Sequence, residues 1–216
     1  MPKRLRLLSV VLLVANGAAA AYTYPDELIA AAVERTRHPV RYDGSYRSIA
    51  YPMGDVPDGV GVCTDVVIRA YRGIGIDLQQ LVHEDMRLAF RSYPQIWGLT
   101  RPDPNIDHRR VPNLQRFFER RGEVLPISRQ ADDYRPGDLV TWMLPGNLPH
   151  IGIVTDLPSP VTGRPLIVHN IGVGPKLEDM LFDYPISGHY RFYARKPQVA
   201  TGAEAETLPR HAAEPD

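Results

Sequence analysis

The sequence contains very little cysteine. Among its 216 residues there is one, Cys63. A single thiol cannot form a disulfide within the chain, so the domain must be held together by packing and hydrogen bonds. In an oxidising compartment a lone thiol is also open to oxidation and to mixed disulfides. Cys63 is therefore either buried and inert, or kept for its chemistry.

The sequence also lacks an apolar run long enough to cross a bilayer, which takes about 20 residues. An apolar segment of nine residues at 7–15 follows three basic residues and precedes small residues that end in an alanine run. This order is typical of a secretory signal peptide. We therefore expect residues 1–21 to be removed. The mature protein is then exported, periplasmic or secreted, without stable insertion into the membrane.

The sequence also lacks an excess of charge of either sign, because 25 basic side chains are matched by 25 acidic ones. The expected leader carries basic residues and no acidic ones, so the remainder is slightly acidic. This balance gives no reason to expect nucleic acid as a partner. The 21 prolines and 17 glycines indicate a turn-rich domain and argue against a helical bundle or a coiled coil.

The apolar pattern changes along the chain from a helical to a strand-like period. Helical spacing is found at 25–36, 63–75, 77–93 and 113–121. Short runs rich in β-branched and aromatic residues follow at 139–142, 151–155, 166–169 and 189–193. Helices that come first and strands that come last predict an α+β domain with an antiparallel sheet.

Three segments outside these elements also have features that predict their structure. Residues 41–61 are rich in tyrosine, proline and glycine and predict an irregular loop. Residues 101–112 are charged and flanked by prolines, which predicts a loop on the surface. The tail 198–216 has few large apolar residues and is expected to be disordered, which leaves 22–197 as the folded domain.

Cys63 follows a glycine-rich loop and begins a predicted helix. Backbone N–H groups at a helix start are unpaired, and the helix dipole there favours negative charge. We therefore expect the pKa of the thiol to fall below its ordinary value of about 8.5. The same N–H groups can stabilise an oxyanion on an attacked carbonyl. The alternative is an inert Cys63 packed beneath the helix start, beside Val62 and Val66.

A thiol nucleophile needs a base and a group that orients this base. His150 stands at the entry of the apolar strand 151–155, where an imidazole can face a cleft. His169 and Asn170 end the next strand, and because neighbouring residues point to opposite faces, only one of them can contact His150. The two strands bring these residues together only if their pairing is staggered. No paired Cys/His spacing indicates zinc, so we expect neither a metal nor a cofactor.

Several segments carry a resemblance to known families. PGDLVTW (136–142), PHIGIV (149–154) and IVH (167–169) resemble the strands of NlpC-type papain-like cysteine peptidases. Over most of 40–195 the chain more specifically resembles a bacterial family, domain of unknown function 1287, through GVCTDVVIRAY (61–71), NIDHRRVPNL (105–114), GDLVTW (137–142) and HIGIV (150–154).

The superfamily resemblance implies a papain-like fold, with N-terminal helices packed on a C-terminal antiparallel sheet. It further implies Cys63 as nucleophile, His150 as base and His169 as the residue that orients the base, with Asn170 as the alternative.

The chain departs from the superfamily pattern around the thiol, where VCTD replaces the usual Asp-Cys-Ser-Gly. Asp65 caps the helix or contacts substrate, and the cap is the favoured role. Asp107, His108, Arg109 and Arg110 form a dense polar cluster. A solvated or salt-bridged cluster is the favoured interpretation, and the alternative is a site where an arginine binds a carboxylate of the substrate.

These observations predict an exported cysteine hydrolase that cleaves an amide bond in peptidoglycan stem peptides or another peptide-like substrate. A transglutaminase-like acyl transferase is one alternative, because that chemistry also uses a Cys at a helix start and a strand-borne His. A catalytically silent module that binds the cell wall is the other.

Overall fold

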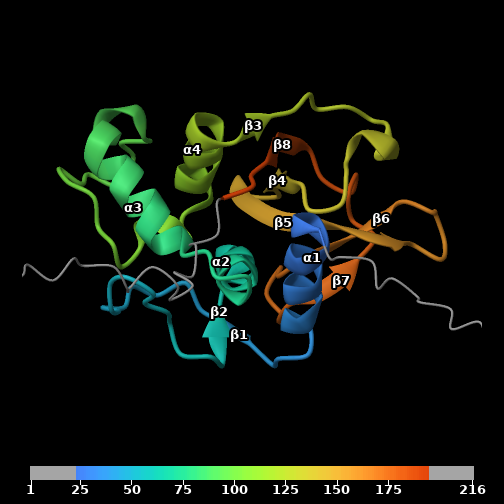
Figure 1. Cartoon of the computed structure of the whole chain (residues 1–216), viewed down its shortest axis with the longest axis horizontal. Coiled ribbons are helices and arrows are strands. Elements are labelled where there is room, and N and C mark those ends of the chain that lie inside the picture. The colour runs from blue at the N-terminus through green and yellow to red at the C-terminus, as the bar shows by residue number, and fades with distance from the viewer. Residues whose placement is uncertain (1–22, 195–216) are drawn as a thin grey trace, which may run out of the picture.

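Helices precede the main sheet in the part of the chain that the computed structural model describes, residues 23–194 (Figure 1). The expected leader and tail lie outside these residues. The helices are α1 (Tyr24–Arg35), α2 (Cys63–Gly73), α3 (Leu78–Ala89) and α4 (Val111–Arg121). All four predicted helices are thus confirmed. Within the same residues, no helix has both the length and the apolar character needed to span a membrane.

Local sequence explains where these helices begin and end. Thr23 and Asp26 form a reciprocal pair of caps at the start of α1. The Asp77 carboxylate accepts a hydrogen bond from the backbone N–H of Gln79 and caps α3. Gly75, with φ of 82°, supplies the left-handed turn that follows α2.

The main sheet is antiparallel throughout, as the order of the elements predicts. Its strands lie in the order β3-β8-β4-β5-β6-β7. Their bounds are β3 (Glu123–Val124), β4 (Leu139–Leu144), β5 (Leu148–Pro158), β6 (Pro165–His169), β7 (Lys176–Glu178) and β8 (Ile186–Arg191). The chain is therefore an α+β domain, and β5 lies near the centre of its sheet.

The two faces of the sheet are covered differently. Ile151 and Ile153 of β5 belong to the main apolar core together with buried residues of all four helices, and both α1 and α2 contact β5 (Figure 1). The intervening residues of the sheet, such as Val154 and Trp142, pack in a second cluster with Tyr134 and the 180–186 segment. Successive side chains of a strand point to opposite faces of the sheet, so the side chain of His150 lies on this second face, opposite that of Ile151.

A short parallel pair of strands, β1 (Arg41–Tyr42) and β2 (Val60–Gly61), occupies the region predicted to be an irregular loop. The backbone N–H of Arg41 donates to the carbonyl of Gly59, and that of Asp43 donates to the carbonyl of Gly61. This pairing corrects the prediction at the two ends of the loop. It also brings Tyr42 level with Gly61, two residues before the thiol.

The prediction of a surface loop at 101–112 is wrong for its second half. Asp107, His108 and Arg109 form a 3₁₀ turn, and all three are buried. The burial is tolerated because the charged groups have partners inside the protein. The Asp107 carboxylate accepts from the backbone N–H of Asp103, and the Arg109 guanidinium pairs with Asp65.

Candidate active site

Cys63 is the first residue of α2, as predicted, and its side chain is 4% exposed. The helix start is capped by Asp65, whose carboxylate accepts a 2.7 Å hydrogen bond from the backbone N–H of Val62. Three polar groups lie close enough to the thiol to influence its pKa: the backbone N–H of Ile151, the backbone N–H of Thr64 and the side chain of Tyr42. Cys63 therefore lies against the residue that directly follows His150.

The contact with Ile151 follows from the direction of the backbone groups in β5. The N–H of Val154 donates to Asp138, on the side of β4, while Ile153 is paired with Val168 of β6. Because backbone groups alternate along a strand, the N–H of Ile151 also points toward the β6 side. The β5–β6 register begins at Ile153, so the N–H of Ile151 lies beyond this pairing and can interact with the thiol of Cys63.

His150 belongs to a relay of three hydrogen-bonded side chains. Its Nε2 lies 3.1 Å from Nδ1 of His169, and Nε2 of His169 lies 3.1 Å from Oε2 of Glu178 on β7. Both imidazoles are 1% exposed, whereas the Glu178 side chain is 45% exposed. A chain of hydrogen bonds thus leads from a carboxylate at the surface to a buried imidazole, and the residue that follows this imidazole in β5, Ile151, contacts the thiol.

The staggered register of β5 and β6 makes this relay possible. Ile153 opposes Val168, so Gly152 opposes His169, and His150 lies diagonally across from it. Gly152 is required at this point, because an added Cβ would lie 2.7 Å from Cγ2 of Ile167 and 3.2 Å from Cβ of His169. The stagger on which the sequence argument depended is therefore present.

The structure brings His169, and not Asn170, into contact with His150. The Asn170 side chain instead accepts hydrogen bonds from the backbone N–H groups of Gly172 and Gly174. It thereby shapes the loop that leads from β6 to β7. The alternative that Asn170 orients the base is not supported by this geometry.

The electrostatics of the site differ from the sequence-based expectation. Burial raises the pKa of the Cys63 thiol to about 11, and the backbone donors only partly oppose this rise. Burial, followed by the neighbouring His169, lowers the pKa of His150 to about 3. The prediction of a thiol pKa below the ordinary value is therefore wrong, because desolvation outweighs the helix start. At neutral pH, Cys63 is therefore a protonated thiol and His150 is a neutral imidazole.

The arginines of the predicted polar cluster are engaged by carboxylates of the protein itself. Arg109 makes two 2.9 Å hydrogen bonds to the Asp65 carboxylate, and both side chains are buried. Arg110 contacts Asp107 at 3.3 Å and lies 4.1 Å above the ring of Trp97. The salt-bridged cluster is thus what the structure contains. The alternative of an arginine fork free for a substrate carboxylate does not fit Arg109.

His108 is also unsuited to bind substrate. It is buried, and burial lowers the pKa of its imidazole to about 3. Within residues 23–194, no group of three or more His, Cys, Asp or Glu side chains is arranged to hold a metal ion.

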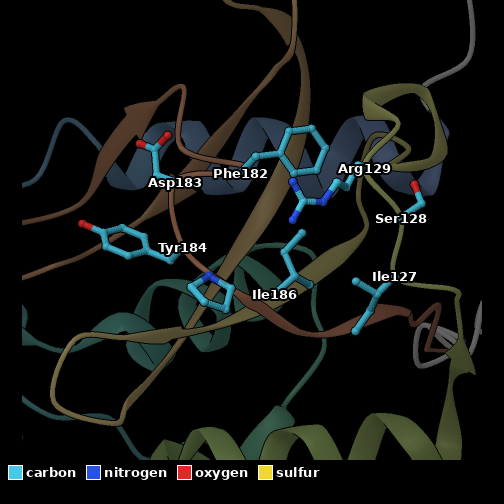
Figure 2. Close-up of a pocket in the computed structure, with 8 residues that line it drawn as sticks. Ile127, Ser128, Arg129, Phe182, Asp183, Tyr184 and Ile186 are labelled. Carbon is cyan, nitrogen blue, oxygen red and sulfur yellow. The ribbon is translucent and has the colours of Figure 1, made fainter.

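An open pocket of about 620 Å³ lies away from these residues, at the start of β8. Figure 2 shows the Phe182 ring beside the Arg129 side chain. The pocket is lined by Ile127, Ser128, Arg129, Phe182, Asp183, Tyr184, Pro185 and Ile186. Ile186 opposes Trp142 on β4, and Trp142 opposes His150 on β5, so two strand spacings separate the pocket lining from the relay. The pocket is therefore separate from the candidate site at the junction of α2 and β5.

The fold and site define an α+β domain with a lone thiol at a helix start and a histidine–histidine–glutamate relay, joined through Ile151, which contacts the thiol and follows His150. The chain belongs to the family described as domain of unknown function (DUF1287), whose model matches residues 29–192. It is similar to the uncharacterized protein YijF of Escherichia coli (strain K12), with 52% identity over 154 residues that cover 71% of this chain and 75% of that protein. The family predicted from the sequence is confirmed.

Sequence reasoning missed two residues of this site. Glu178 follows a glycine-containing loop in the alternating run Lys176-Leu-Glu178, which is a signal for a short strand but not for its pairing. Tyr42 is the second residue of the segment 41–61, which the sequence predicts to be an irregular loop, and no pattern links it to Cys63. Only the small β1–β2 pair makes that link.

Proposed function

We propose that this protein is a cysteine hydrolase of the NlpC-type papain-like class, and that it cleaves an amide bond. The observation that carries the proposal is the relay from Glu178 through His169 to His150, which ends next to the residue that contacts the Cys63 thiol. Buried imidazoles that are hydrogen-bonded to each other and to a carboxylate are costly to assemble. A relay that ends one residue before the contact of the one thiol of the chain supports a nucleophile and its base.

The protonation of the resting site determines how the attack proceeds. Because the thiol pKa is raised and the imidazole pKa is lowered, the thiol keeps its proton until substrate arrives. As sulfur forms its bond to the substrate carbonyl carbon, the thiol proton passes to His150, and the carbonyl π electrons move to oxygen. When the oxyanion collapses, the C–N bond breaks and His150 donates this proton to the departing amine. Water then hydrolyses the thioester and restores the thiol.

The oxyanion needs hydrogen-bond donors, and two kinds lie at the thiol. The first is the backbone N–H groups in the first turn of α2. The second is the Tyr42 hydroxyl, which contacts Cys63. Burial, followed by Cys63, raises the pKa of this phenol to about 12, so it remains a protonated donor at neutral pH.

The proposed substrate is the peptide part of peptidoglycan, reached after export from the cytoplasm. The support for the substrate is the resemblance of segments 136–142, 149–154 and 167–169 to NlpC-type strands. The support for export is the pattern of a signal peptide in residues 1–21.

Hydrolysis of defined muropeptides, followed by mass analysis, tests the proposal. The wild-type protein is expected to release fragments, whereas Cys63→Ala and His150→Ala are expected to reduce the rate by several orders of magnitude, as removal of a nucleophile or its base does. Glu34→Ala is the matched control, because it breaks a carboxylate–histidine pair on the surface of α1. Undiminished release by Cys63→Ala contradicts the proposal.

A second candidate, a catalytically silent module that binds the cell wall, is favoured by one observation. Cys63 is buried and its pKa is raised, as in an inert thiol. Co-sedimentation with purified sacculi separates the two functions. Equal binding of wild type and Cys63→Ala, with no fragments released by either, identifies the silent module.

A further inference from the structure

Glu178 is the member of the relay farthest from His150, and it takes no direct part in the proposed transfer of the thiol proton. It lies on β7, opposite Ile167, and its Oε2 contacts His169 while its Oε1 lies 3.3 Å from Lys176. Its side chain is half-exposed, whereas both histidines are buried. The residue is therefore the end of the relay that solvent reaches.

We propose that Glu178 is a positioning residue that sets the tautomers of both histidines and leaves Nδ1 of His150 as the unprotonated base. A carboxylate only accepts hydrogen bonds, so Nε2 of His169 must carry a proton. In the neutral imidazole, Nδ1 of His169 is then an acceptor. Nε2 of His150 must donate to it, and Nδ1 of His150 keeps its lone pair. The catalytic part of this inference rests on the proposed function.

The opposite arrangement of protons is incompatible with the same contacts. If Nδ1 of His169 carried the proton, its Nε2 would present a lone pair to the Glu178 carboxylate at 3.1 Å, which is repulsive. Nε2 of His150 would then have to accept, and Nδ1 of His150 would carry a proton. A base in that form cannot take the proton of the thiol.

The tautomers can be measured without any substrate. Two-bond ¹H–¹⁵N correlation spectra of the ¹⁵N-labelled full chain at pH 7 distinguish the two neutral forms, and His150→Gln and His169→Gln assign the resonances. We expect both histidines of the wild type to be protonated at Nε2. Glu178→Ala is expected to give a mixture of both forms. Glu178→Gln retains an oxygen acceptor and is expected to restore the wild-type form.

Turnover of the same variants measures the catalytic consequence. Loss of a residue that orients a functional histidine typically costs about 10- to 100-fold, by analogy with the partners of metal-bound histidines. We expect Glu178→Ala to lose activity in that range, Glu178→Gln to recover most of it, and Glu34→Ala to match the wild type. Circular dichroism and thermal unfolding check that each variant is folded.

The outcomes are distinct. Protonation of His150 at Nδ1 in the wild type, or unchanged tautomers in Glu178→Ala, overturns the proposal. Failure of Glu178→Gln to restore them also overturns it, because the acceptor oxygen is the stated cause. If spectra behave as expected but no variant, nor the wild type, hydrolyses an amide, then the proposed function fails and the assignment of the tautomers stands.

Discussion

The reactivity of Cys63 toward an alkylating reagent should depend steeply on pH. A thiol with a pKa of about 11 is ionised in roughly one molecule in 10⁴ at pH 7, whereas an ordinary thiol with a pKa of about 8.5 is about 3% ionised. Since only the thiolate reacts, ionisation alone makes Cys63 about 300-fold slower than a free thiol. The rate should rise about tenfold for each pH unit from 7 to 10, without a plateau near 9.

Mass spectrometry of the intact protein treated with iodoacetamide measures this rate directly, because Cys63 is the single cysteine. The slope against pH is diagnostic, since burial also slows access of the reagent. His150→Ala should change the slope little, because a His150 with a pKa of about 3 is neutral throughout. A fast rate that is independent of pH between 6 and 8, and that His150→Ala abolishes, would instead reveal a thiolate–imidazolium pair and refute this account of the resting site.

Three further predictions concern the surroundings of the thiol. Arg109→Ala leaves the buried Asp65 carboxylate unpaired and should lower the free energy of unfolding by about 3–5 kcal/mol in urea titrations. Gly152→Ala overpacks the sheet opposite His169; it should cost about 1–3 kcal/mol and reduce turnover more than this loss of stability explains. Tyr42→Phe removes a hydroxyl donor and should lower kcat by about 10²-fold with little change in unfolding.

Matched variants serve as controls for these three changes. Arg37→Ala breaks an exposed pair with Glu34 and should cost about 0–1 kcal/mol. Tyr51→Phe removes an exposed hydroxyl elsewhere on the same loop and should leave kcat unchanged. Equal costs for Arg109→Ala and Arg37→Ala would contradict the buried pair. Equal kcat for Tyr42→Phe and wild type would remove the phenol from the oxyanion site.

Much of the fold could be predicted from local patterns. The helices and long strands have strong periodicity, clear caps such as Asp77, and glycine stops such as Gly75. The α+β order and the start of α2 at Cys63 follow from these signals. Strands of two or three residues, such as β1 and β7, have no such signal, because their pairing depends on partners distant in the chain.

Three members of the candidate site could be predicted from the sequence, but Glu178, Tyr42 and the pKa of the thiol could not. Cys63, His150 and His169 could be chosen from their positions at element ends, whereas the choice between His169 and Asn170 required the register of β5 and β6. The direction of the thiol pKa shift could not be predicted, because burial of the sulfur depends on how α2 packs against β5. The prediction of a surface loop failed at 107–109 for a similar reason, because local composition does not reveal that the buried Asp65 is the partner of Arg109.

The central claim is that the sulfur of Cys63 bonds covalently to the substrate carbonyl carbon with help from His150. Acid quenching of the wild-type protein during reaction with a muropeptide, followed by peptide mass spectrometry, tests it most directly. We expect an acyl group on the peptide that contains Cys63, and none on the same peptide from His150→Ala. Substrate cleavage with no acyl group ever found on Cys63, or with the group on another residue, would contradict it.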